Sequence, residues 1–179
     1  MNPAVLPDPA PLLALGFVVF GIPAGTKERR RGWHAGLIDN PDELADRWLV
    51  GDNIGVACRP SRLVVLDLDI KEGVHGRDVL AHAAARARRP WPDTFTVNTP
   101  SGGCHLYFQA PAGEVPSTSG GVTRLGPAID VRAPGRTRGG YVLGPGSVIG
   151  GRCYCICDDR PVQPLPAWIT TALTNRKSG

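Results

Sequence analysis

The hydrophobic residues of this chain stand mostly in short runs separated by glycine, proline and charged residues, a pattern typical of β-strands. The high content of glycine and proline, 23 and 18 of 179 residues, also favours many turns and few long helices. We therefore predict an α+β fold with a mixed sheet. Expected strands lie at 53–60, 63–70, 94–99, 104–110, 128–133 and 139–149, and expected helices at 39–49, 76–89 and 164–173.

Two local patterns predict how neighbouring elements connect. The segment 94–110 contains two strand-like runs around "PSGG" at 100–103, which is the arrangement of a β-hairpin. The strands at 53–60 and 63–70 are joined by a tight connection, so we expect them to pair with each other. Asn40 has the position of a helix cap, followed by proline and a glutamate.

The chain length suits one domain, which we expect at 10–172, after a loose leader at 1–9 and before a tail at 173–179. The apolar segment 10–20 resembles a signal-peptide core, but no lysine or arginine precedes it. No run approaches the roughly 18 to 20 apolar residues of a membrane span, so we expect a buried helix or strand there and no membrane contact. Five cysteines, an odd number, do not indicate a disulfide framework and fit a cytoplasmic protein.

The stretch "RLVVLDLDIKEG" carries two carboxylates on an apolar strand. Side chains alternate along a strand, so Asp67 and Asp69 point to the same face, about 7 Å apart. Two carboxylates so placed repel each other in a half-buried setting, and a divalent cation between them removes that cost. The alternative is that two acids at the end of a strand simply face water.

A third carboxylate, Asp130, stands on the apolar run 128–133, with Arg132 on the same face. One interpretation is an ion pair between these two side chains. The other is that Asp130 converges on Asp67 and Asp69. Three such acids suit a two-metal site, in which ions about 3.5–4 Å apart clamp the attacking and leaving oxygens of a displacement.

The turn that precedes His105 has the composition of a phosphate-binding loop. Gly102 and Gly103 allow backbone N–H groups to approach a phosphate, and Ser101 adds a hydroxyl donor. A single histidine in a strand is more often an ordinary core or surface residue. Beside this turn, however, His105 is a plausible phosphate ligand.

The net charge of +4 mildly favours a polyanionic partner. Basic runs at 27–31, 86–89 and 136–138 are ordinarily solvated surface, but together they can follow a phosphate backbone. The alternating cysteines Cys153, Cys155 and Cys157 share one strand face. Structural zinc normally needs CxxC-type spacing and four ligands, so we do not expect zinc there.

Three segments in this order resemble the N-terminal catalytic domain of bifunctional DNA primase/polymerases, the Prim-Pol branch of the archaeo-eukaryotic primase superfamily. They are "NIGVACRPSRLVVLDLDI", "TPSGGCHLYFQAP" and "RLGPAIDVRAPG…GGYVLGPGS", and the resemblance runs from about Phe17 to about Trp168. It implies an RRM-like mixed sheet joined to a smaller α/β unit, with the active site between them.

The resemblance also implies a set of site residues. They are the acids Asp67, Asp69 and Asp130, the "SGG-x-H" residues Ser101, Gly102, Gly103 and His105, and Lys27 in the place of a basic loop residue. The chain departs from the family pattern at two points. Cys104 stands where many relatives carry arginine, and the loop around Lys27 lacks the usual proline.

The activity that the resemblance implies is template-directed nucleotidyl transfer in plasmid- or phage-type replication. A primase/polymerase of this kind joins NTPs or dNTPs to a primer on single-stranded DNA, with two Mg²⁺ or Mn²⁺ ions held by the three acids. Ser101, Gly102, Gly103, His105, Arg132 and Lys27 are then expected to contact the nucleotide. Longer relatives carry a helical accessory region and a helicase, so we expect a partner of that kind.

Two other classes of function remain open at this point. One is a non-catalytic module that binds single-stranded nucleic acid, against which three converging carboxylates would argue. The other is a metal-dependent phosphohydrolase, whose Asp-x-Asp-x-Thr pattern has Lys71 in place of threonine here.

Overall fold

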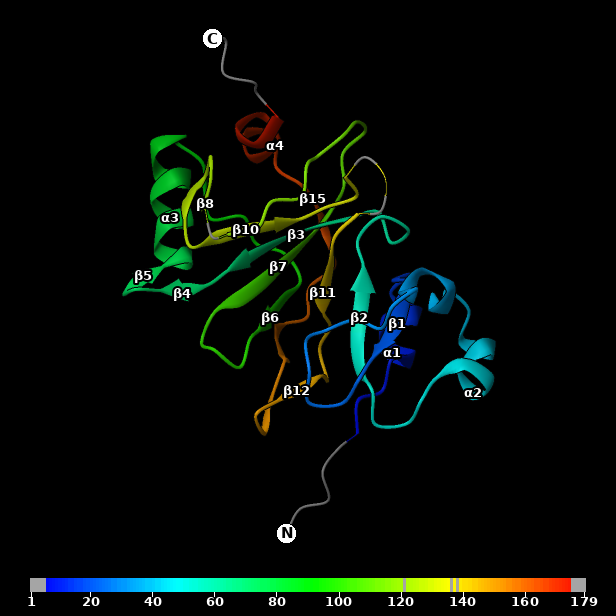
Figure 1. The fold of residues 1–179 in the computed structure, drawn as a ribbon. Helices are drawn as coiled ribbons and strands as arrows, with labels where there is room; N and C mark the ends of the chain where they lie inside the picture. The colour runs from blue at the N-terminus through cyan, green and yellow to red at the C-terminus, as the bar shows by residue number, and fades with distance from the viewer. Residues whose placement is uncertain (1–5, 121, 136, 138, 175–179) are drawn as a thin grey trace.

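The computed structural model describes residues 6–120, 122–135, 137 and 139–174. It is a mixed α+β fold with two main antiparallel sheets and a few short helices (Figure 1), which confirms the α+β class. Residues 136 and 138 of the third basic run lie outside the described residues. So do residues 1–5 of the expected leader and 175–179 of the expected tail.

The larger sheet is built around two buried central strands, β3 and β7, which pair antiparallel along their whole length. Its strand order is β10-β3-β7-β6-β14, and a short β15 adds to β7 in parallel. The predicted hairpin is confirmed as β6 and β7. The bounds are β3 Leu63–Leu68, β6 Thr96–Asn98, β7 Cys104–Gln109, β10 Ile129–Arg132, β14 Cys155–Asp158 and β15 Gln163–Pro164.

The smaller sheet has the order β1-β2-β11, with bounds Val19–Ile22, Asn53–Ala57 and Tyr141–Leu143. The expected pairing of the strands at 53–60 and 63–70 is therefore wrong, because β2 and β3 belong to different sheets. The physical reason is that each of the two is a central strand. The edges of β2 are taken by β1 and β11, and those of β3 by β10 and β7.

Side chains alternate along the strands of the larger sheet, so each of its two faces contributes to a separate hydrophobic core. One face, with Leu66 and Leu106, packs against α3 (Gly76–Arg86) and α4 (Ala167–Thr174). The opposite face, with Val65 and Tyr107, packs against the smaller sheet and α1 (Ala10–Ala14). The elements thus lie in the order α3 and α4, larger sheet, smaller sheet with α1 (Figure 1), and the chemistry described below lies between the two sheets.

The remaining elements are short. Asn40 caps its segment as expected, accepting a hydrogen bond from the Asp42 N–H at 3.0 Å, but the helix expected at 39–49 ends at Arg47. Short helices gain little without a continuous apolar face, and Leu49 and Val50 are exposed here. No helix in the described part of the chain has the length and hydrophobicity needed to span a bilayer. The bounds are η1 Trp33–Gly36, η2 Pro41–Glu43, α2 Leu44–Arg47, β4 Ile70–Lys71, β5 Val74–His75, β8 Val122–Thr123, β9 Gly126–Pro127, β12 Val148–Ile149 and β13 Arg152–Cys153.

The three alternating cysteines are exposed on β13 and β14, but a register shift between Ile156 and Asp158 interrupts the alternation that was expected to put all three on one face. The structure joins Cys153 and Cys155 in a disulfide, which the sequence analysis did not anticipate, and Cys157 is free. Tyr154, between the joined pair, points the other way and is buried.

Gly103, which directly precedes β7, is packed too closely against β3 to carry a side chain. A Cβ added to Gly103 would lie 2.2 Å from the Leu68 carbonyl oxygen on the neighbouring strand. We expect Gly103→Ala to lower the free energy of unfolding by roughly 1–3 kcal/mol, measured by urea denaturation. Gly36→Ala is the control, because nothing lies within 4 Å of its added Cβ. Equal stability of the two variants would contradict the close packing of this turn against β3.

Candidate active site

Three carboxylates meet at the end of the central strand β3. Asp130 on β10 is directly opposite Asp67 in the antiparallel register, and Asp69 follows the last residue of β3. Ligand oxygens of the three side chains lie within 4.8 Å of one another. Asp130 is buried, and the other two are half-buried. Carboxylate oxygens at this spacing are the hard ligands that divalent cations such as Mg²⁺ and Mn²⁺ take, so the residues fit a metal centre.

Two cationic side chains balance this cluster of acids. The Lys71 ammonium lies 2.7 Å from Asp69 and 4.0 Å from Asp130, and the Arg132 guanidinium lies 3.1 Å from Asp130. The hydrogen bond to Asp69 is the main reason that the pKa of Lys71 is raised above its usual value. The two interpretations of Asp130, an ion pair and convergence on the other acids, therefore hold together. Lys71 is a member of the site that the sequence analysis considered only for a phosphohydrolase.

His105 contacts Asp67 from the other neighbouring strand. The two residues are paired in the β3–β7 register, and the His105 Nε2 lies 3.3 Å from an Asp67 oxygen. Burial acts to raise the pKa of Asp67, but the hydrogen bond from His105 and the nearby charges outweigh it, so the pKa is lowered. The second ring nitrogen, Nδ1, is buried and has no partner in the described part of the chain. His105 thus holds Asp67 ionised and oriented.

The predicted residues on this face line a hollow of about 430 Å³, which we call the inter-sheet hollow. Asp67, His105 and Arg132 reach it from the larger sheet, and Tyr141 from β11 of the smaller sheet. Lys27 lines it from the loop after β1, and its carbonyl oxygen accepts a hydrogen bond from the Tyr141 hydroxyl at 3.2 Å. The hollow therefore has a basic and aromatic wall together with one of the three acids, Asp67.

Tyr154 is a further lining residue that the sequence analysis missed. It is buried, and its ring centre lies 5.6 Å from that of His105. Burial, together with the charges of Asp67 and Asp69, raises the pKa of Tyr154 to about 12, so its hydroxyl remains protonated at neutral pH. The available signal was the alternation of "CYCIC", in which the tyrosine faces away from the cysteines.

The glycine turn is placed differently from His105. Gly102 and Gly103 line a second, smaller hollow of about 110 Å³ together with Asp69 and the start of α3. Ser101 is exposed, and its hydroxyl lies 3.0 Å from that of Thr99. The structure therefore separates Gly102 and Gly103, which share one hollow with Asp69, from His105, which shares the other with Asp67, and Ser101 lines neither.

Cys104 faces away from the inter-sheet hollow, toward α3. Burial raises the pKa of its thiol to about 11, against the opposing influence of the nearby Arg77 guanidinium. Arg77 also lies over the ring of Trp91, 5.2 Å from its centre. A guanidinium is thus present beside position 104, although it comes from α3.

Only part of the described basic runs lies at the inter-sheet hollow. Lys27 and Arg29 of the first run line the inter-sheet hollow. Arg30 of the same run is bound to Asp52. None of residues 86–89 lines this hollow.

The contact between Lys71 and the acids gives a prediction about metal affinity. Lys71→Met removes an ammonium that competes for the carboxylate oxygens of Asp69 and Asp130. We expect Mn²⁺ to bind roughly two- to fivefold more tightly, the size of a surface ion pair, by isothermal titration calorimetry. Lys27→Met is the matched control, because Lys27 is in no ion pair among the described residues. Unchanged or weaker Mn²⁺ binding by Lys71→Met would refute the competition.

The comparison with known families covers nearly the whole chain. The family model for bifunctional DNA primase/polymerase, N-terminal (Prim-Pol), matches residues 10–168. No curated protein matches the chain. The matched range contains the three converging acids, the glycine turn and His105. On this match, the chain belongs to the Prim-Pol family, the N-terminal domain of bifunctional DNA primase/polymerases.

Proposed function

We propose that this chain is a template-directed nucleotidyltransferase that joins NTPs or dNTPs to a primer on single-stranded DNA, in plasmid- or phage-type replication. The observation that carries the proposal is the convergence of Asp67, Asp69 and Asp130 at the edge of a hollow with a basic wall. Family membership supplies the reaction class. We further propose that residues 10–172 form one catalytic domain that works with a helical accessory region or a helicase.

The three acids are proposed to hold two divalent cations, Mg²⁺ or Mn²⁺. Such ions, when bound, activate a 3′-hydroxyl and neutralise the developing charge on pyrophosphate. His105 keeps Asp67 ionised and fixed in orientation, which readies one ligand before any cation arrives. Lys71 is paired with Asp69 and Asp130, and Arg132 with Asp130, which limits the repulsion among the acids.

In the proposed reaction, the primer oxygen forms a bond to the α-phosphorus as the bond to the pyrophosphate oxygen breaks, and the hydroxyl proton passes to solvent. His105, Arg132 and Lys27 line the inter-sheet hollow and are proposed to contact the triphosphate. Tyr154 remains a neutral hydroxyl donor beside them. The turn residues Ser101, Gly102 and Gly103 are proposed to bind phosphate oxygens from the Asp69 side.

The order of the strands supports the expectation of an RRM-like sheet. Along the chain, β3, α3, β6, β7 and β10 follow one another, and the sheet order is β10-β3-β7-β6 with antiparallel neighbours. We propose that this unit is the RRM-like half of the domain. The smaller sheet with α1 is then the second α/β unit, and the inter-sheet hollow lies between the two.

Removing the acids tests the proposed reaction. Asp67→Asn and Asp130→Asn keep the shape of the side chains but remove the negative charge needed to hold cations. We expect each to lower primer extension on a single-stranded DNA template on the order of a hundredfold or more, measured with a labelled primer and Mn²⁺ or Mg²⁺. Asp158→Asn, a carboxylate outside both hollows, is expected to retain activity. Normal extension by Asp67→Asn or Asp130→Asn would contradict the metal-site assignment. Release of inorganic phosphate instead of pyrophosphate would indicate a phosphohydrolase.

Kinetics of a His105 variant separate two roles of this residue. His105→Ala removes an imidazole from the wall of the inter-sheet hollow, and a lost hydrogen bond to a charged group costs about tenfold or more in affinity. We expect the KM for the nucleotide to rise by about that factor. A fall in kcat with an unchanged KM would instead restrict His105 to orienting Asp67.

A further inference from the structure

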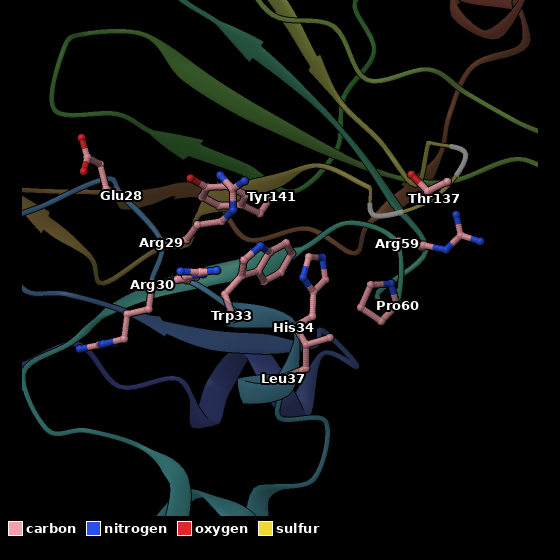
Figure 2. A pocket seen from close by; sticks show the side chains of 12 residues that line it. Glu28, Arg29, Arg30, Trp33, His34, Leu37, Arg59, Pro60, Thr137 and Tyr141 are labelled. Atoms are coloured by element: carbon pink, nitrogen blue, oxygen red, sulfur yellow. The ribbon is translucent and has the colours of Figure 1, made fainter.

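Besides the two hollows described above, a larger groove lies next to the inter-sheet hollow, over the smaller sheet. It measures about 1240 Å³ and is formed mainly by the loop after β1, by η1 and by residues near Arg59 (Figure 2). We call it the basic groove. It shares Arg29, Trp33, His34 and Tyr141 with the inter-sheet hollow. Because the two share these walls, a molecule bound in the basic groove can extend into the inter-sheet hollow, where Asp67 lies.

Two neighbouring rings, Trp33 and His34, line the basic groove, and Phe20 packs against Trp33 from the core. Phe20 lies in the core, and its ring centre is 4.3 Å from that of Trp33. Trp33 is 8% exposed, and its ring centre is 3.9 Å from that of His34, at an interplanar angle of 31°. His34 is exposed. The buried rings therefore support an outer imidazole that is open to solvent, and Figure 2 shows Trp33 and His34 side by side in the groove.

The loop that carries these rings is held in place before any ligand binds. The Arg30 guanidinium donates two hydrogen bonds to the Asp52 carboxylate, at 2.6 and 2.8 Å, and a third to the Gly21 carbonyl. Asp52 is buried. Gly32, with φ of 74°, turns the chain into η1 in a conformation that favours glycine. Preorganisation of this kind reduces the ordering cost of binding.

The described walls of the basic groove carry more cationic than anionic side chains, with four arginines against the single carboxylate of Glu28 (Figure 2). The Arg29 guanidinium lies 5.4 Å from the ring centre of Tyr141 and 6.0 Å from that of Trp33. Arg31 is exposed, and Arg59 is fixed by a hydrogen bond to the Gly135 carbonyl at 3.0 Å. Neither Arg29 nor Arg31 is in an ion pair with a carboxylate of the described residues. The charge and the open ring together match a polyanion with flat, unpaired bases.

We propose that the basic groove binds the single-stranded DNA template, with an unpaired base stacked on His34 and backbone phosphates at Arg29 and Arg31. The assignment of this strand as template rests on the proposed function. A single strand is required because only an unpaired, unstacked base offers a free face to an aromatic ring. The arginines supply the charge that follows the backbone.

The test measures binding without catalysis. A fluorescein-labelled oligo(dT) is titrated with the full chain in EDTA and without nucleotide, and fluorescence anisotropy gives the Kd. We expect His34→Ala to weaken binding about tenfold, the typical cost of one lost base stack, and Arg29→Ala/Arg31→Ala to weaken it at least as much. The matched controls are His82→Ala and Arg86→Ala/Arg89→Ala, which remove the same side chains from exposed positions on and after α3 and are expected to bind like the native chain.

Two further measurements distinguish base stacking on His34 from electrostatic attraction to the phosphate backbone. The double arginine variant is expected to reduce the slope of log Kobs against log salt by about 1.4, since each phosphate contact on single strands contributes about 0.7. An oligonucleotide with abasic sites is expected to bind the native chain and His34→Ala with similar affinity. Equal weakening by the α3 controls, unchanged binding by the groove variants, or no binding of oligo(dT) by the native chain would each overturn the proposal.

The binding experiment can refute the basic groove without refuting the proposed reaction, and the reverse. Asp67→Asn is expected to bind oligo(dT) normally in EDTA, because the acids are not part of the basic groove. Loss of binding in the groove variants without primer extension by the native chain would support the groove and refute the polymerase. Extension with unchanged template binding in the groove variants would refute the groove alone.

Discussion

The candidate active site depends on the register of β3 between its two neighbours. Antiparallel pairing places Asp130 of β10 on one side of Asp67 and His105 of β7 on the other, with all three side chains on the same face. A slip of one residue in either ladder would turn one of these side chains to the opposite face, into the core covered by α3 and α4. That core, with Leu66 and Leu106 on the reverse face, therefore fixes the position of the polar groups.

The same register imposes an electrostatic cost. Like charges directly opposite each other on a sheet are destabilising, and here Asp67 faces Asp130 with Asp69 close by. The fold compensates with two groups of different burial. His105 is buried and packed, whereas Lys71 is exposed and carried by a short strand after β3. The imidazole is bonded to Asp67 and the exposed ammonium to Asp69. An incoming cation can therefore replace the ammonium without disturbing the buried imidazole.

Much of this could be predicted from local sequence. Alternation along 63–70 led us to expect Asp67 and Asp69 next to each other, and they belong to one cluster. However, β3 ends at Leu68, and the two acids line different hollows. The hairpin at 94–110 followed from its turn. Which strands pair is a non-local property: the sequence around 53–70 contains two central strands, and nothing in it tells that they separate into different sheets. For the same reason the contact of Lys71 with the acids was not predictable, because it depends on how the chain turns after β3.

The "SGG-x-H" motif shows how alternation limits a reading of linear sequence. His105 follows Cys104 and Gly103 directly, yet successive strand residues face opposite sides, so the imidazole reaches the inter-sheet hollow while the turn lies with Asp69 at the start of α3. The acids connect the two sides, since Asp67 lines one hollow and Asp69 the other. A motif that reads as one loop thus contributes to both sides of the acid cluster.

The two sheets supply different chemistry to the space between them. The larger sheet presents carboxylates held by backbone register, and the smaller sheet presents arginines and rings held by the Arg30–Asp52 ion pair and by packing on Phe20. Both sets are attached to the second hydrophobic core, which includes Val65 and Tyr107 of the larger sheet. Because interiors of this kind are close-packed and transmit strain, that core sets the distance between the acids and the basic groove.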